Sequence, residues 1–118
     1  MTPDELKHRT RTFALEIIKL AKTLPSDFVT AHIARQLMRS GTSVGANYRS
    51  SCRAKSEADF IAKMSIVEEE ADEVGYWIEL LVETNNVPPK SVSTVMSESE
   101  QLVRIVVASI KTARGRSR

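Results

Sequence analysis

The sequence predicts an all-α protein, a single antiparallel up-down-up-down four-helix bundle. Glycine and proline are scarce, with four of each in 118 residues, and aromatic residues make up only 5% of the chain. That composition disfavours a β-sandwich or β-barrel, which needs many turns and strand-forming residues. Apolar residues instead recur at helical spacing along four stretches. Only short breaks separate the stretches, so consecutive helices are expected to pack antiparallel.

The first helix is expected at about 4–23. Thr2 offers an N-cap, with a proline directly after it and a glutamate three residues further on. The apolar stripe of this helix consists of Leu6, Phe13, Ile17, Leu20 and Leu24. Pro25 ends the helix because its ring cannot continue one, and Ser26 can cap the next helix.

The second helix is expected at about 27–53, although residues 40–43 read Ser-Gly-Thr-Ser and resemble a break. The apolar register continues through this segment, and a loop would have no reason to preserve it. The positions in register are Ile33, Leu37, Gly41, Val44, Tyr48 and Cys52. Glycine inside a helix costs about 1 kcal/mol relative to alanine. We expect a neighbouring helix to approach Gly41 and Gly45 closely, which would offset that cost.

The third helix is expected at about 57–84, capped by Ser56. Its apolar residues alternate steps of four and three, the pattern of a coiled-coil seam. They are Phe60, Met64, Val67, Ala71, Val74, Ile78 and Leu81. Residues 85–89 read as a loop, and a fourth helix follows at about 90–113. Residues 1–113 thus form one domain, and residues 114–118 are expected to be a basic, disordered tail.

Charge is distributed in blocks, although the formal net charge is only +2. Residues 26–55 carry five basic groups against one acidic group, and residues 56–85 carry one basic group against nine acidic groups. Such blocks predict electrostatic pairing between elements, a charged partner, or both.

Clustered arginines are the strongest functional candidates, because guanidinium groups can neutralise phosphates. The residues predicted to bind nucleic acid are Arg35, Arg39, Arg49, Arg53, Lys55, Lys111 and Arg114. The alternative is that these cations pair with the acidic third helix, within a subunit or across an interface. Stacking aromatics are nearly absent here, which argues against sequence-specific base reading.

Metal, cofactor and catalytic sites are not predicted. A di-metal bundle site needs a Glu-x-x-His pair on each of two helices, and Glu5 with His8 is the only copy. The single Cys52 lies at a core-like phase, where a free thiol acts as a small hydrophobic group. No apolar run approaches the ~20 residues that span a bilayer, so we expect no membrane association. Cysteine usage and the polar start of the chain favour a cytoplasmic protein.

Tyr76, Trp77 and Leu80 lie beside the seam of the third helix. They either fill an interface between subunits, where aromatic residues are favoured, or flank the core.

The chain resembles the 23S rRNA intervening-sequence protein family, also called the four-helix bundle protein family. The resemblance covers nearly the whole chain and is carried by RSGTSVGANYR at 39–49, FIAK at 60–63, EEADE at 69–73, YWIELL at 76–81 and VASIKTAR at 107–114. It implies an antiparallel four-helix bundle, often assembled as a ring-shaped homopentamer. It also implies similarity to the accessory protein of diversity-generating retroelements, which binds nucleic acid and a reverse transcriptase. Ser50 and Ser51 depart from the family, many members of which carry an acidic residue there.

The family has no established catalytic residue, so the resemblance transfers none. The function predicted from the residues and the resemblance is a non-enzymatic, oligomeric bundle that binds nucleic acid, specifically structured RNA, through a basic surface. The alternative is a homo-oligomeric scaffold for protein–protein interaction that does not bind nucleic acid.

Overall fold

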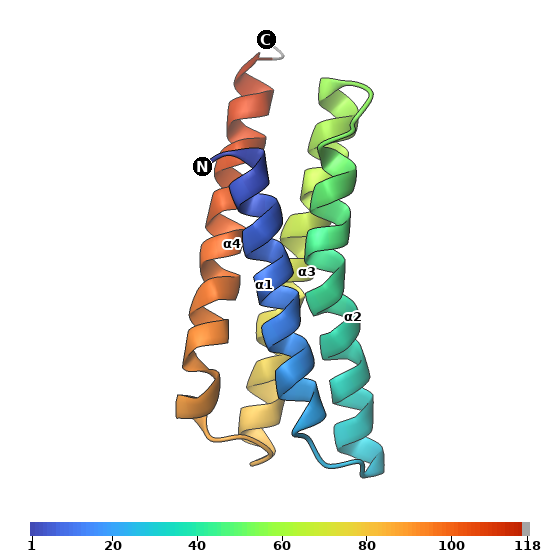
Figure 1. Ribbon diagram of the computed structural model, residues 1–118, viewed down its shortest axis with the longest axis vertical. Coiled ribbons are helices and arrows are strands. Elements are labelled where there is room, and N and C mark those ends of the chain that lie inside the picture. Colours follow the sequence, from blue (N-terminus) through green and yellow to red (C-terminus); the bar gives the residue numbers. More distant parts are fainter. Residues whose placement is uncertain (117–118) are drawn as a thin grey trace.

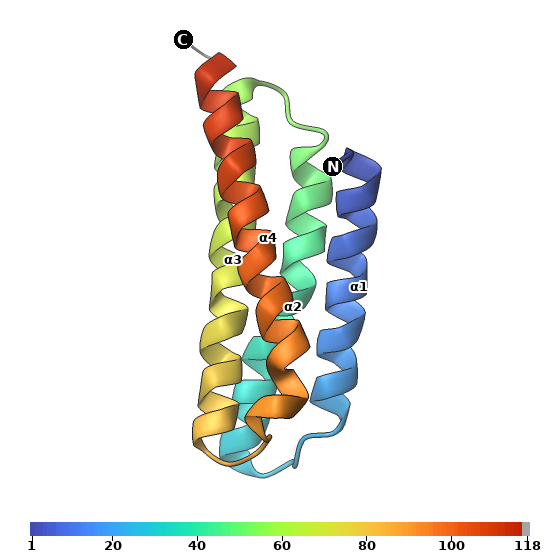
Figure 2. The same cartoon turned by 90° about the vertical axis from the view of Figure 1, so that its left-hand side faces the viewer.

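Four antiparallel helices form an elongated up-down-up-down bundle in the computed structural model, which describes residues 1–116 (Figures 1 and 2). The helices are α1 (Pro3–Lys22), α2 (Phe28–Ser51), α3 (Glu57–Glu83) and α4 (Pro89–Arg116). The molecule measures 49 × 23 × 21 Å. Its long axis follows from helix length, since 27 residues in α3 at 1.5 Å per residue span about 40 Å. The predicted fold class is confirmed.

Side chains cap the first three helices and satisfy N–H groups that the first helical turn leaves unpaired. Thr2 accepts a hydrogen bond from the backbone N–H of Glu5 at 3.1 Å, and Ser56 caps α3 in the same way. Asp27, rather than the expected Ser26, caps α2 by accepting from the N–H of Thr30 at 3.0 Å. These three hydrogen bonds place the helix starts within one residue of the predicted positions.

The continuity of α2 through residues 40–43 is confirmed, and Gly41 explains why a glycine is needed there. A Cβ on Gly41 would lie 2.8 Å from Cγ1 and Cγ2 of Ile17, which is fully buried on α1. At Gly45 a Cβ would lie 3.2 Å from Oγ1 of Thr10. The two glycines therefore allow α1 to approach the backbone of α2 more closely than any larger residue would.

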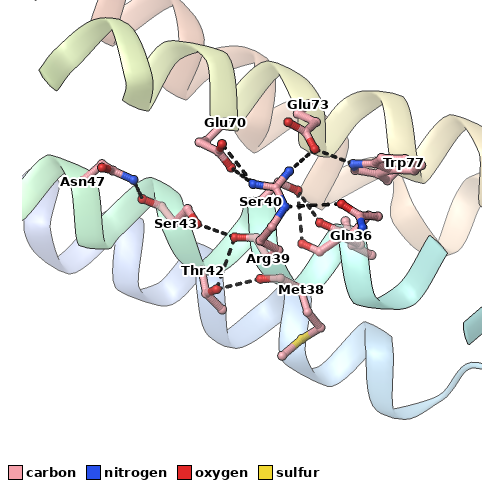
Figure 3. A network of polar contacts seen from close by, with 11 residues as sticks. Gln36, Met38, Arg39, Ser40, Thr42, Ser43, Asn47, Glu70, Glu73 and Trp77 are labelled. Carbon is pink, nitrogen blue, oxygen red and sulfur yellow. Dashed lines mark hydrogen bonds and ion pairs between the residues drawn. The ribbon is translucent and has the colours of Figure 1, made fainter. Parts of the chain in front are cut away.

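The hydroxyl groups of residues 40–43 do not break the helix because they bond to its own backbone. Ser40 donates to the carbonyl of Gln36 at 3.0 Å, and Thr42 donates to the carbonyl of Met38 at 2.6 Å. Ser43 donates to the carbonyl of Arg39, also at 2.6 Å (Figure 3). The polar segment is thus compatible with a helical backbone.

The core runs the length of the bundle, and α3 contributes the largest share to it. The fully buried residues of α3 are Met64, Val67, Ala71, Val74, Ile78 and Leu81. They are six of the seven residues of the predicted seam; the seventh, Phe60, is half-buried against the same core. Contacts are extensive between consecutive helices but sparse between α1 and α4, so this side of the bundle is the least tightly packed.

Two expectations about helix ends are corrected by the structure. The helix α2 ends at Ser51, so Cys52 is exposed at its C-cap instead of lying in the core. Ser51 and Tyr48 are buried at this end of α2 and occupy the core position that was predicted for Cys52. Helix α4 continues to Arg116, beyond the expected end at 113, because basic residues in the last turn suit the negative end of the helix dipole. Residues 117–118 of the expected tail lie outside the described residues.

Candidate nucleic-acid interface

Arg39, one of the predicted phosphate-binding residues, is held by the acidic helix α3 (Figure 3). Its Nη1 donates to both carboxylate oxygens of Glu70 at 3.1 Å, and its Nη2 bonds to Glu73. Its Nε donates to Gln36 at 3.3 Å, and the indole of Trp77 donates to Glu73 at 2.9 Å. Arg39 therefore pairs with the acidic third helix within the subunit, which is the alternative to phosphate binding.

These contacts shift the pKa values of Arg39 and Glu73 in the directions that favour the charged form of each side chain. Hydrogen bonds to Glu73 and then Glu70 raise the pKa of Arg39 above its ordinary value. Burial alone would raise the pKa of Glu73, but the hydrogen bonds from Trp77 and Arg39 together outweigh it and lower this pKa. Both groups are therefore charged at neutral pH, and Arg39 has few donors left for a phosphate.

The other predicted cations behave differently. All are exposed, and none forms an ion pair with another residue of the described chain. Five of them share the end of the bundle where α1 and α3 begin and α2 and α4 finish (Figures 1 and 2). They are Arg49, Arg53, Lys55, Lys111 and Arg114. Arg35 lies 14 residues before Arg49 on α2, about 21 Å away along the helix, and does not join them.

We name this region the basic end and define it as residues 1–8, 46–63 and 108–116. It contains eight lysines and arginines against four aspartates and glutamates. Antiparallel packing brings the three segments together, which no local sequence window reveals. Lys7 joins the basic end from the second turn of α1 and is not among the residues predicted from the sequence.

Two of the acidic groups at the basic end already have partners. Asp59 accepts hydrogen bonds from the ammonium of Lys63 at 3.1 Å and from the backbone N–H of Lys55 at 3.0 Å. These bonds, with the one from the Lys55 backbone as the larger cause, lower the pKa of Asp59. Glu57 lies 3.6 Å from Arg116. The remaining cations therefore dominate the surface potential of this end.

A groove of about 1,000 Å³ lies within the basic end. Its walls come from all four helices and from the α2–α3 loop. The lining side chains include apolar, hydroxyl and cationic groups and one carboxylate, among them Leu6, Lys7, Tyr48, Ser51, Cys52, Lys55, Glu57, Phe60, Ile105, Ala108, Ser109, Thr112 and Arg116. Burial and the adjacent Cys52 raise the pKa of Tyr48, so its phenol stays protonated at neutral pH.

The residues predicted for an oligomer interface divide between surface and core. Tyr76 is 54% exposed, whereas Trp77 and Leu80 are half-buried and pack against the core. The Trp77 ring makes edge contacts with His32 and Tyr76, at centroid distances of 6.1 and 5.0 Å. Trp77 thus closes the α2–α3 side of the subunit, and Tyr76 is the residue of the three that faces solvent.

Two further features are absent from residues 1–116. No three histidine, cysteine, aspartate or glutamate side chains gather in this part of the chain in a way that could hold a metal ion. Within the same residues no helix combines the length and the hydropathy needed to cross a bilayer.

Comparison with known proteins agrees with the geometry. A crystal structure of a protein of unknown function from the S23 ribosomal protein family of Bacteroides thetaiotaomicron superimposes with a TM-score of 0.85. The two sequences are 35% identical, and the match covers 94% of this chain and 99% of that one. No curated protein matches. Residues 5–108 match the sequence profile of the 23S rRNA-intervening sequence proteins, and the chain belongs to that family.

Proposed function

We propose that this protein binds nucleic acid, specifically structured RNA, by means of the basic end, and that it acts by binding without catalysing a reaction. The observation that carries the proposal is a group of six cations from α1, α2, α4 and the α2–α3 loop that lack ion-pair partners in the described chain; five are exposed and Lys7 is half-buried. These residues are Lys7, Arg49, Arg53, Lys55, Lys111 and Arg114. A protein gains little stability from charges held together without partners, whereas a polyanion would neutralise them and release counterions.

The charge on the rest of the surface also supports binding of RNA at the basic end. Residues 64–107 carry nine acidic groups against two basic groups, and most of them lie on α3. A phosphate backbone is repelled by this region and attracted by the basic end, so charge alone orients the RNA. The family name, which refers to an insertion in 23S rRNA, agrees with RNA as the partner. Within residues 1–116 no exposed aromatic side chain belongs to the basic end, which favours backbone contacts over sequence-specific base reading.

A second function, a homo-oligomeric interaction scaffold, is favoured by apolar side chains exposed away from the basic end. Phe28 is 89% exposed, and Tyr76 and Ile66 are 54% and 43% exposed on α3 among carboxylates. Exposed large apolar groups often mark protein interfaces. We propose that the protein self-associates, and a homopentamer is the assembly that the family resemblance implies. Light scattering across a micromolar range tests this, and a monomer throughout would contradict it.

The experiment on RNA binding compares the wild type with the double variant Arg49→Gln/Arg53→Gln. Affinity for a labelled structured RNA is measured by fluorescence anisotropy at several salt concentrations. Loss of two phosphate contacts should weaken binding about tenfold or more at low salt and reduce the slope of log K against log salt by roughly 1 to 2. Arg35→Gln, which removes another exposed arginine far from the basic end, is the matched control and should leave both quantities unchanged.

The two functions predict different results for the same double variant. If RNA affinity stays the same while light scattering shows a smaller assembly, the arginines hold subunits together and the scaffold function is correct. If neither quantity changes, the basic end has neither role.

A further inference from the structure

The groove of the basic end combines an apolar floor with a cationic rim. Leu6, which is only 5% exposed, forms part of the floor. The half-buried ring of Phe60 and the half-buried branched side chain of Ile105 form the rest of it. Lys7 and Lys55 lie on the rim and form no ion pair within the described chain. Duplex phosphates would use only the cations, because the backbone of a double helix presents no apolar surface to such a floor.

An unpaired nucleotide matches both parts of the groove. Its base has a flat apolar face that can leave water, and its phosphate carries the charge that the lysines need. The volume of about 1,000 Å³ is at the upper end of the range for sites that enclose small ligands, so a nucleotide fits with room for a neighbour. Ser109 lines the same groove and has no hydrogen-bonded partner for its hydroxyl within residues 1–116, so it is available to a base edge.

A second groove on the α1–α4 side shows that this combination is not a general property of the bundle. It has about 850 Å³ and an apolar lining that includes Phe13 and Leu20. Its charged lining residues are Glu16, Glu98 and Lys19, a net charge of −1, whereas those of the groove in the basic end are Lys7, Lys55, Arg116 and Glu57, a net charge of +2. A lining with net negative charge is less favourable for a phosphate than one with net positive charge. Of these two grooves, the one in the basic end is complementary to a nucleotide in both charge and polarity.

We propose that the groove of the basic end holds an unpaired nucleotide of the bound RNA, with its base on Leu6, Phe60 and Ile105 and its phosphate between Lys7 and Lys55. The proposal rests on the proposed function and makes it narrower. The bound RNA then has to offer a single-stranded loop, bulge or end, and a fully paired duplex is the weaker ligand.

The test uses two RNAs and one groove-blocking variant of the full chain. One RNA is a hairpin with a single-stranded loop, and the other is a blunt duplex with the same stem sequence. Ala108→Trp places an indole in the groove from an exposed position of α4 without removing a cation or a core residue. Ala62→Trp, at an exposed alanine of α3 outside the groove, is the matched control. Circular dichroism establishes that both variants fold.

Loss of one stacked base should reduce hairpin affinity about tenfold in Ala108→Trp and leave duplex affinity within about twofold of the wild type. Ala62→Trp should change neither affinity. If the wild type binds hairpin and duplex equally, or Ala108→Trp weakens both to the same extent, the nucleotide site is wrong while RNA binding by the basic end stands. If the wild type binds neither RNA, the proposed function fails and the nucleotide site with it.

Discussion

The middle of the bundle and the basic end use cationic residues in opposite ways. In the middle, Arg39 bonds to Glu70 and Glu73 on α3, and Arg9 bonds to Glu98 and Gln101 on α4. At the basic end six lysines and arginines lack such partners within the described chain. The packing of the helices also differs between the two regions. Gly41 allows α1 and α2 to approach closely in the middle, whereas a groove opens at the basic end.

This difference shows that a run of arginines in a sequence is not one functional surface. Arg39 and Arg49 lie on the same helix and are both exposed, but only Arg39 faces a row of carboxylates on its neighbour. Charges with partners contribute to the fold, and charges without partners are available to a ligand. The following substitutions separate the two roles.

The largest effect is expected for Gly41→Ala in the middle of the bundle. The added Cβ would lie 2.8 Å from the branched side chain of Ile17, which is fully buried and cannot move aside. Overpacking costs about 1–3 kcal/mol, and the helix propensity of alanine offsets about 1 kcal/mol of that. The difference is a net loss of up to about 2 kcal/mol in the free energy of unfolding, measured by urea denaturation.

Gly75→Ala is the control for that substitution, because no atom beyond the adjacent residues and the local helix backbone lies within 4 Å of a Cβ placed on Gly75. Only the helix propensity remains, so the variant should be more stable by roughly 1 kcal/mol. The same sign for both variants would contradict the close approach of α1 to α2 at Gly41.

Arg9→Gln tests the link between α1 and α4. The guanidinium of Arg9 donates to both oxygens of Glu98 at 2.7 Å, and both side chains are about three-quarters buried, with exposures of 27% and 24%. A two-point bond of this kind contributes more than an exposed pair, so we expect a loss of about 1 kcal/mol in the free energy of unfolding. Arg11→Gln, at an exposed arginine two residues away, should stay within about 0.5 kcal/mol of the wild type.

Arg39→Gln and Arg49→Gln should differ in which property they change, stability or RNA affinity. Arg39→Gln should lower the denaturation midpoint slightly and leave RNA affinity unchanged, because its donors are used by α3. Arg49→Gln should leave the midpoint unchanged and weaken RNA binding a few-fold, the effect of one phosphate contact. Anisotropy and thermal denaturation on the same samples measure both quantities. A loss of RNA affinity in Arg39→Gln would show that the network opens for the ligand.

The smallest effect is expected in the pH dependence that Glu73 contributes. Its pKa in the folded protein lies below the ordinary value of 4.5, so its charge stabilises the fold above that pH. The stabilisation is lost as the pH falls from about 4.5 through the lower pKa of the folded state. Glu73→Gln should therefore show a shallower loss of stability in acid than the wild type, measured as denaturation midpoints across this range. An equally steep loss would place the acid sensitivity on other carboxylates.

Much of the fold could be predicted from the sequence because helical periodicity is a local property. The seam of α3 and the unbroken α2 follow from spacing alone, and Gly41 signalled a close helix contact. The predicted core position of Cys52 was wrong, because the apolar spacing in the sequence continues past the residue at which α2 ends. The candidate site was predicted only in part, since nothing near Lys7 in the sequence connects it with Lys55.

The order of apolar and polar residues by itself determined four helices, and the short breaks between them determined their antiparallel pairing, because both are local features of the chain. The family followed from the resemblance of whole motifs. Only the tertiary structure decided which arginines have carboxylate partners and where a groove opens. Those properties depend on side chains from distant parts of the chain, and helix packing sets the distances between them.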